Sequence, residues 1–321
     1  MTGENLTHLS AIQPVKPATH RLAETPTDAD RLLALSPSEI HLWLAFYEEA
    51  GEELHGAYRE ILEPAEKERE PRFYFAADRR RYLVTRALVR TVLARYVPLA
   101  PRDWRFAANA YGRPEIASPQ GRRAGLSFNV SHTRDLIVLG VTRGRALGVD
   151  VENVGKRDAA IDVARHYFAP VEVSALARVP AAQQHHRFFD YWTFKESYIK
   201  ARGMGLSLPL DRFSVHFPDD HTVERRIDRD LGDEARRWEL VQLRPTPEYL
   251  LAVCAERVAP TPSQLVVRQT VPLSSEKLLA LPCVRVRKRA SSGRPTVTTR
   301  ELEMTPHERG RSGANASLRS L

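Results

Sequence analysis

Hydrophobic and polar residues follow two different periods along this chain, and these periods predict where its strands and helices lie. Residues 39–46 alternate as a strand does, with successive side chains on opposite faces, although a short helix is the alternative there. Residues 62–96 show helical spacing, and Pro71 is expected to divide this stretch into two helices. A turn bounded by prolines at residues 98–101 leads into a predicted strand at residues 104–107.

The rest of the chain completes this set of elements and then begins a second set. Strands are predicted at residues 126–130, 136–141 and 148–152, helices at 161–168, 170–178 and 182–203, and further strands near 213–216, 237–243 and 249–255. Gly203 is expected to end the longest of these helices as a C-cap. Helices followed by strands, twice over, indicate an α+β fold of two similar halves rather than a βαβ array.

Composition divides the chain into four segments. Residues 1–37 are polar, with scattered Pro and Thr, and we expect them to be mostly disordered. Residues 38–147 and 148–258 are the expected N-terminal and C-terminal halves. Residues 259–321 hold eleven Lys or Arg and four Glu, so seven of the eight net positive charges lie there. We expect this basic tail to be disordered as well, because its end is rich in Arg, Ser, Gly and Thr.

Several classes of protein are excluded by what the sequence lacks. No run approaches the roughly 18 apolar residues that a membrane-spanning helix needs. The first ten residues have no basic region followed by an apolar one, so we expect no secretory signal. Cys254 and Cys283 give no disulfide framework, and Cys254 lies in an apolar run where a small core residue is expected. These features together favour the cytoplasm.

Charged residues interrupt one helix and one strand in a way that points to chemistry. Glu196 and Lys200 are four residues apart in an aromatic-rich helix, so they share one face. Charges so near a core are costly unless they bind each other, a metal or a ligand. Asp150 and Glu152 alternate with valines and point to one side of a strand; alone, they could be the solvent face of an edge strand. Three carboxylates and a lysine suit a phosphate site with Mg²⁺, or with Mn²⁺, because these ions prefer oxygen ligands.

Other candidate residues give weaker signals taken one at a time. Ser131 and His132 follow a strand end, where a structural histidine is an equal alternative. Arg113 lies in a Gly-Arg-Pro turn and Arg81 in a basic helix, and both could simply be solvated. The sequence has neither a G-x-S-x-G elbow nor a Walker A motif, which argues against a serine hydrolase and a P-loop enzyme.

Taken in order, these motifs resemble those of the Sfp-type 4′-phosphopantetheinyl transferases. The matching segments are YGRP, FNVSHT, GVDVE, WxxKESxxK and GLSLPLDRFSV, within a resemblance that runs from about Glu63 to Val258. It implies two pseudo-symmetric α+β halves with a cleft near residue 148, in a monomer. It also implies an Mg²⁺-dependent transfer of 4′-phosphopantetheine from coenzyme A to a serine of an apo acyl or peptidyl carrier protein, with release of 3′,5′-ADP.

The resemblance also implies roles for individual residues. Asp150, Glu152 and Glu196 match the metal-side carboxylates, and Lys200 matches the lysine that contacts the phosphate. Glu196, Lys200 and Asp150 are then the catalytic residues, with either Glu196 or a water held by Glu152 accepting the serine proton. The implied coenzyme A-binding residues are Arg81, Arg113, Ser131 and His132, together with Lys67 and Arg69 ahead of Phe73 and Lys200 itself.

Two other functions compete with this interpretation. A coenzyme A or nucleotide pyrophosphohydrolase would use the same carboxylates with water as the nucleophile, but the chain has no glutamate-rich hydrolase helix. A nucleic-acid-binding protein would use the basic tail, but no aromatic residues lie between its arginines, and we expect no specific nucleic-acid partner. Truncation at Val258 should separate these functions, because a transferase is expected to survive it.

Overall fold

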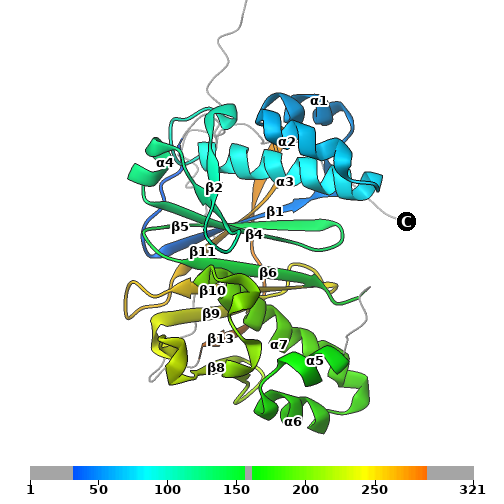
Figure 1. Ribbon diagram of the computed structural model, residues 1–321, viewed down its shortest axis with the longest axis vertical. Helices are drawn as coiled ribbons and strands as arrows, with labels where there is room; N and C mark the ends of the chain where they lie inside the picture. Colours follow the sequence, from blue (N-terminus) through cyan, green and yellow to red (C-terminus); the bar gives the residue numbers. More distant parts are fainter. Residues whose placement is uncertain (1–31, 156–160, 288–321) are drawn as a thin grey trace, which may run out of the picture. The chain divides into compact units, whose positions relative to one another are not determined.

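The computed structural model describes residues 32–155 and 161–287, which form a mixed α and β structure (Figure 1). One sheet, in the order β12-β11-β1-β5-β4, is the centre of the N-terminal half. Its strands are β1 (Glu39–Phe46), β4 (Leu126–His132), β5 (Leu136–Arg143), β11 (Gln264–Val271) and β12 (Ser275–Leu279), and a separate hairpin pairs β2 (Phe106–Ala108) with β3 (Pro114–Ile116). The predicted α+β class is confirmed.

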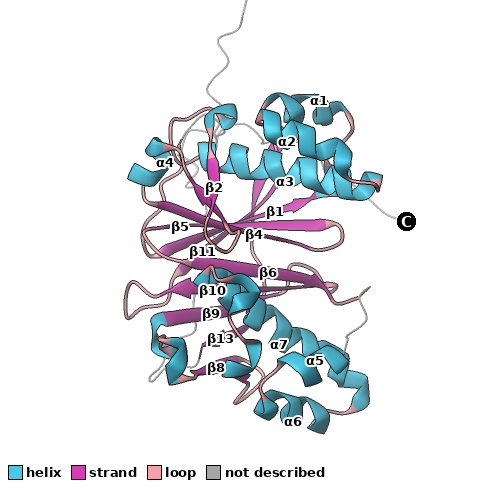
Figure 2. Cartoon of the chain, viewed as in Figure 1, coloured by secondary structure: helices cyan, strands magenta, loops and turns pink. Residues whose placement is uncertain are grey.

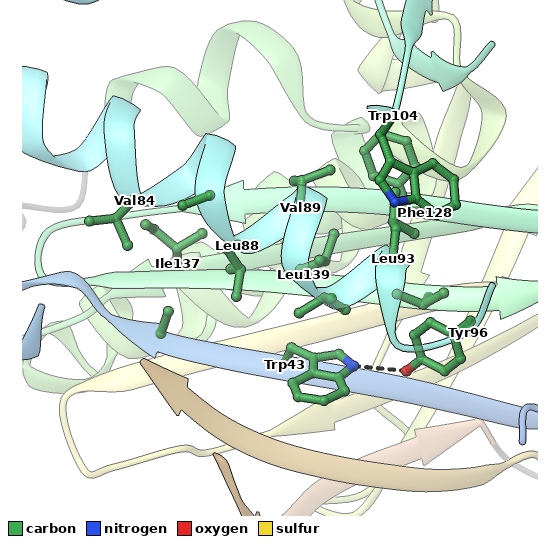
Figure 3. Packing of buried hydrophobic residues seen from close by; sticks show 14 of the residues in the cluster. Trp43, Val84, Leu88, Val89, Leu93, Tyr96, Trp104, Phe128, Ile137 and Leu139 are labelled. Carbon is green, nitrogen blue, oxygen red and sulfur yellow. Dashed lines mark hydrogen bonds between the residues drawn. The ribbon is translucent and has the colours of Figure 1, made fainter. Parts of the chain in front are cut away.

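Helices cover one face of this N-terminal sheet, as Figure 2 shows. They are α1 (Glu53–Glu60), α2 (Pro64–Arg69) and α3 (Ala76–Ala94), with the short α4 (Pro119–Arg123) further along the chain. Pro71 lies in the turn between α2 and α3, so the predicted division is confirmed. Helix α3 buries its apolar side chains in a core that includes Trp43, whose Nε1 donates to the Tyr96 hydroxyl at 2.8 Å (Figure 3).

The C-terminal half has a second sheet, in the order β6-β10-β9-β13-β8-β7. Its strands are β6 (Leu147–Asn153), β7 (Phe213–His216), β8 (Thr222–Ile227), β9 (Trp238–Leu243), β10 (Tyr249–Glu256) and β13 (Cys283–Arg287). Its helices are α5 (Ile161–Tyr167), α6 (Pro170–Arg178) and α7 (Ala181–Arg202). Gly203 has φ +69° and ends α7 as predicted, because glycine adopts left-handed backbone without steric cost.

The two sheets share one hydrophobic cluster, so the halves pack together through strands. Ile40, Leu42 and Leu44 of β1 are fully buried there. They meet the valines of β6, Val149 and Val151, which point away from Asp150 and Glu152. Alternation in β6 therefore divides its residues between this shared core and the opposite face, as the sequence predicted.

The prediction of a disordered C-terminal tail is wrong for its described part. Strand β11 pairs in parallel with β1, β12 pairs with β11, and β13 lies between β9 and β8. Leu265 and Val267 enter the shared core with the less buried Val266 between them, and the basic composition around this short apolar run concealed the strand. Residues 288–321 lie outside the described part of the chain.

The predicted N-terminal segment falls mostly on residues 1–31, which are also outside the described part. Residues 32–37 carry no helix or strand, and Leu35 is buried in the N-terminal core. No helix among residues 32–155 and 161–287 is long and apolar enough to cross a membrane.

Candidate functional site

Helix α7 lies directly against strand β6, and a glycine makes this close approach possible. A Cβ atom on Gly148 would come within 1.9 Å of the Ser197 carbonyl oxygen and 2.4 Å of the Ala201 nitrogen. Any larger residue would therefore push the helix away from the strand. The glycine of the GVDVE motif thus sets the distance at which α7 presents its side chains to Asp150.

Three residues of α7 form one face toward the same cavity. Trp192, Glu196 and Lys200 follow one another at intervals of four, and each is half-buried, whereas most of their neighbours in the second half of the helix are buried. All three line a cavity of about 730 Å³. The sequence identified Glu196 and Lys200 but gave no role to Trp192, although its spacing from Glu196 was a usable signal.

Both halves of the protein contribute to this cavity. The C-terminal half supplies Asp150, Val151 and Glu152 of β6 together with the face of α7. The N-terminal half supplies residues of α3 and β4 and the segments beside them: Arg69, Phe73, Asp78, Arg81, Tyr82, Thr85, Arg86, Val89, Pro114, Phe128, Val130, Ser131 and His132. The structure therefore brings together nearly all the candidate residues that the sequence singled out.

A hydrogen-bonded ion pair joins α7 to β6, and the Ser131 hydroxyl of β4 connects it to the N-terminal half. The Lys200 ammonium donates to Asp150 Oδ1 at 2.6 Å and to Ser131 Oγ at 2.9 Å. Ser131 Oγ in turn donates to Asp150 Oδ1 at 3.1 Å, and it accepts the backbone N–H of Val151. The Asp150 side chain is only 6% exposed, so this pair is held in a place shielded from solvent.

The second carboxylate oxygen of Asp150 is left for another partner. Asp150 Oδ2 is buried and makes no hydrogen bond. Glu152 accepts the indole N–H of Trp192 at 3.1 Å, which turns its carboxylate toward the same cavity. A buried carboxylate oxygen without a donor is costly unless a cation or a ligand meets it. The carboxylates of Asp150 and Glu152 therefore offer oxygen ligands, which are the ligands that Mg²⁺ prefers.

These carboxylates do not form a complete metal site by themselves. Among the described residues, no three His, Cys, Asp or Glu side chains lie close enough together to hold a metal ion. Mg²⁺ is usually bound by one or two protein carboxylates, with water and substrate phosphates completing its octahedron. The residues present fit that kind of shared site, in which the substrate is one of the ligands.

Basic side chains gather at the opposite side of the cavity, on and beside α3. Arg81 pairs with Asp78 at 2.6 Å, and Arg86 lies over the Tyr82 ring, with the guanidinium carbon 5.3 Å from its centroid. Arg69, which is exposed, reaches the same rim. Arginines in this arrangement suit a phosphate group, because guanidinium donors match its oxygen atoms.

His132 lies between these arginines and Lys200. Its pKa is lowered, first by partial desolvation of the imidazole, although His132 is exposed at the end of β4, and then by the positive charges of Arg81 and Lys200. The ring is therefore neutral at pH 7, and it can offer one N–H as a hydrogen-bond donor without adding charge.

Two of the residues predicted to bind the substrate do not line this cavity. Lys67 is exposed on α2, outside the set of lining residues. The Arg113 guanidinium instead donates to backbone carbonyl groups of both halves, including the carbonyl of Lys200 at 2.7 Å. The two terminal nitrogens of Arg113 therefore have acceptors within the protein, while its role toward a phosphate stays a prediction.

The first lysine of the WxxKE motif has a structural role. Lys195 is fully buried and pairs with Glu172 at 2.7 Å, and it also donates to the carbonyl groups of Leu210 and Phe213. Burial of this kind is tolerated because every ammonium hydrogen has an acceptor. Lys195 therefore fixes the segment after α7 to the helix, while Glu196 next to it faces the cavity.

Comparisons with known proteins agree with the motifs. Residues 50–143 match the family model described as 4′-phosphopantetheinyl transferase, N-terminal, and residues 146–254 match that of the 4′-phosphopantetheinyl transferase superfamily. A 4′-phosphopantetheinyl transferase of Bacillus subtilis is 37% identical over 185 residues, which is 57% of this chain and 77% of the relative.

Two other relatives match over somewhat longer stretches. The 4′-phosphopantetheinyl transferase Sfp of Bacillus subtilis is 31% identical over 198 residues, covering 62% of this chain and 84% of the relative. The 4′-phosphopantetheinyl transferase HetI of Nostoc is 29% identical over 221 residues, covering 69% and 89%.

Proposed function

The chain belongs to the 4′-phosphopantetheinyl transferase superfamily, and we propose how its cavity carries out the reaction of that family. The protein is an enzyme that transfers the 4′-phosphopantetheine group of coenzyme A to a serine of a carrier protein. The observation that carries the proposal for its site is the Lys200–Asp150 pair, which leaves Asp150 Oδ2 buried and without a hydrogen bond. A diphosphate between this pair and the arginines of α3 would meet positive charge along its length.

Of the carboxylates of Asp150, Glu152 and Glu196, one or two would hold Mg²⁺ at a time, together with the diphosphate of coenzyme A. When bound there, the ion would neutralise the diphosphate and stabilise the negative charge that grows on the leaving phosphate. Lys200 serves the same end from the protein side, because its ammonium lies next to Asp150 and can turn toward a phosphate oxygen.

The transfer exchanges one phosphorus–oxygen bond for another. The serine oxygen of the carrier protein forms a bond to the phosphorus of the phosphopantetheine group, and the diphosphate bond to 3′,5′-ADP breaks. The serine proton passes to Glu196, which lines the cavity, or to a water held by Glu152. Asp150 and Ser131 keep Lys200 in place during this exchange.

The nucleotide end of coenzyme A is proposed to lie against α3. Arg81 and Arg86 would bind its 3′-phosphate, with Arg69 at the rim and the neutral His132 as a further donor. The pantetheine arm would then point outward, so that coenzyme A carrying an acyl group can also serve as the donor.

An exposed aromatic pair marks where the carrier protein would dock. Tyr74 is 90% exposed and Phe75 is 64% exposed, and they follow Phe73, which lines the cavity. Arg72 and Arg79 flank this pair in the sequence and are exposed, which complements carrier proteins that are acidic beside their serine. Since one chain supplies both sides of the cavity, we propose a monomer, and its two free cysteines are consistent with the cytoplasm.

Calorimetric titration of coenzyme A into the full chain tests this site directly. We expect Mg²⁺ to strengthen binding at least about fivefold in the unmodified protein, and Asp150→Asn to abolish that gain, because it removes a charged ligand. Asp162→Asn changes an exposed carboxylate on α5 and should leave the Mg²⁺ effect intact. An equal Mg²⁺ effect in Asp150→Asn would contradict the proposed metal position.

A further inference from the structure

The turn that carries Arg113 reaches from the N-terminal half to the end of α7. Arg113 Nη1 donates to the carbonyl groups of Lys200 at 2.7 Å and Ala201 at 3.2 Å. Its Nη2 donates to the carbonyl groups of Phe128 at 3.2 Å and Leu147 at 3.1 Å. One planar guanidinium therefore joins the last turn of α7 to strands β4 and β6.

This contact satisfies groups that a helix cannot satisfy alone. The last four carbonyl groups of any helix have no partner within the helix. Asn109 adds a second contact from the same turn, since its Nδ2 donates to the Gly203 carbonyl at 2.9 Å. Its Oδ1 accepts the backbone N–H of Arg113, which fixes the turn itself. A positive charge at the C-terminus of α7 also complements the helix dipole.

The residue held in this way is one that the proposed function depends on. Lys200 is bound at both ends: its carbonyl by Arg113, and its ammonium by Asp150 and Ser131. Helix ends fray unless they are capped, and Lys200 lies only two residues from the end of α7. A frayed last turn would move the ammonium away from Asp150 even though the lysine itself were unchanged.

We propose that Arg113 is a positioning residue that acts through Lys200, by capping the end of α7 from the other half of the protein. This inference rests on the role of Lys200 in the proposed function. It assigns no contact between Arg113 and the substrate, because four of the five guanidinium N–H groups already meet carbonyl oxygens.

Labelling of lysines measures the position of Lys200 without relying on catalysis. The full-length protein would be treated with trace acetic anhydride, and mass spectrometry of its peptides would give the ratio of Lys200 to Lys67 acetylation. Lys67 is exposed on α2 and serves as the internal reference. We expect Arg113→Met to raise the ratio at least about threefold, and Arg113→Lys, which keeps the charge and some donors, to give an intermediate ratio.

Arg145→Met is the matched control for a purely structural effect. Arg145 is also buried and also joins separate elements through hydrogen bonds, to the carbonyl groups of Glu39 and Glu256 and to Ser263 Oγ. It makes none of its described contacts with α7. We expect it to lower the melting temperature while leaving the labelling ratio unchanged. An unchanged ratio in Arg113→Met, or an equal rise in Arg145→Met, would overturn the inference.

Kinetics then separate this inference from the proposed function. If the unmodified protein transfers phosphopantetheine, Arg113→Met should lower kcat/KM for coenzyme A about tenfold. The same change made in a Lys200→Gln background should cost less than about twofold, because the two residues act as one unit. If the loss of kcat/KM from Arg113→Met were as large in the Lys200→Gln background as in the unmodified protein, the inference would be overturned. If the unmodified protein transfers nothing, the proposed function fails, and the labelling ratio still decides the role of Arg113.

Discussion

Individual side chains in this protein are charged where the fold would otherwise be apolar, and each such charge has a specific partner. Lys195 meets Glu172 within the core, whereas Lys200 meets Asp150 at the wall of the cavity. The two ion pairs differ in the hydrogen bonds that their carboxylate oxygens accept. Glu172 accepts backbone N–H groups on both oxygens, but Asp150 keeps one buried oxygen without a hydrogen bond. The first pair is thus complete, and the second is suited to a ligand.

Arg81→Ala should distinguish two donors that differ by one phosphate. We expect the KM for coenzyme A to rise about tenfold and that for dephospho-coenzyme A by less than about twofold, because only coenzyme A carries the 3′-phosphate. Steady-state kinetics with a carrier protein would measure both. Arg79→Ala, on the same helix but outside the cavity lining, should change neither KM. Equal rises for the two donors would remove Arg81 from the 3′-phosphate site.

His41 should make the stability of the protein depend on pH in the acid range. Burial and the charge of Arg268 lower the pKa of His41 to about 3, and its Nδ1 lies 2.9 Å from the Tyr96 hydroxyl. The unfolded chain therefore takes up a proton that the folded chain refuses. The stability due to neutral His41 is fully present above about pH 6.5 and is lost as the pH falls toward 3.

Urea unfolding at pH 7, 6 and 5 would measure this dependence. We expect His41→Asn to reduce the slope of unfolding free energy against pH by up to about 1.4 kcal/mol per unit. His221→Asn changes an exposed histidine and should leave the slope as it is. A slope that is the same in His41→Asn and in the unmodified protein would refute this account of His41.

At the residue scale, the sequence indicates which charged residues line the cavity where they interrupt a regular pattern of apolar residues. Glu196 and Lys200 were found for that reason, and Asp150 and Glu152 because they alternate with valines. The main-chain contacts of Arg113 were not predictable, because its acceptors belong to residues far away along the chain. No local pattern shows that a guanidinium will meet four main-chain oxygens once the two halves have folded.

At the scale of elements, the cavity depends on the packing of helix α7 against strand β6. Both were predicted within a few residues of their observed bounds, because strict alternation and long helical spacing are strong signals. Helix α1 and strand β8 were missed. The first has few apolar residues around Gly56, and the second buries Arg225, whose guanidinium carbon lies 4.0 Å from the centroid of the Tyr198 ring. A buried arginine looks like a surface residue in a sequence.

Gly148→Ala should disturb the packing of α7 against β6 more than the addition of a methyl group at any other position of β6. The added Cβ would meet main-chain atoms of α7, which cannot rotate away as a flexible side chain can. We expect a loss of about 1–3 kcal/mol or more in unfolding free energy, measured by urea denaturation.

Gly56→Ala is the control for this change. Gly56 lies within α1, and a Cβ there would have nothing within 4 Å. Alanine should therefore raise the stability by about 0.5–1 kcal/mol, because it favours the helical backbone. If the two substitutions had the same effect, the close contact at Gly148 would not limit the packing of α7.

At the scale of the whole molecule, residues 264–287 hold the two halves together, although the composition suggested that this segment could be removed. Strand β11 lies beside β1 in one sheet, and β13 is inserted between β9 and β8 in the other. Arg285 of β13 donates to Asp190 of α7 at 2.7 Å and to Gln242 of β9 at 2.7 Å. Burial raises the pKa of Asp190 even with Arg285 beside it. Residues 264–287 are therefore part of both halves.

Truncation after Val258 should consequently destroy the enzyme, contrary to the expectation from composition. It would remove three strands and leave the Asp190 carboxylate buried without Arg285, a loss of about 3–5 kcal/mol for this pair alone. We expect the melting temperature to fall by at least about 10 °C and transfer to be lost. Truncation after Arg287 removes none of the described contacts and should preserve both. Full activity after the first truncation would show that these strands are dispensable.

The halves themselves were predictable, because each repeats helices followed by strands, but the path of the last segment was not. Strand β11 has only three consecutive apolar residues, Leu265 to Val267, followed by Arg268 and Gln269, so in the sequence it resembles a surface segment. Its place beside β1, more than 200 residues earlier, follows only from the assembled core.

The measurement that tests the central claim most directly is the mass of an apo carrier protein after incubation with this protein, coenzyme A and Mg²⁺. We predict a gain of one phosphopantetheine group, which EDTA prevents and which Glu196→Ala reduces at least about tenfold although the variant remains folded. Cleavage of coenzyme A without any gain of mass on several carrier proteins would contradict the account and indicate a hydrolase instead.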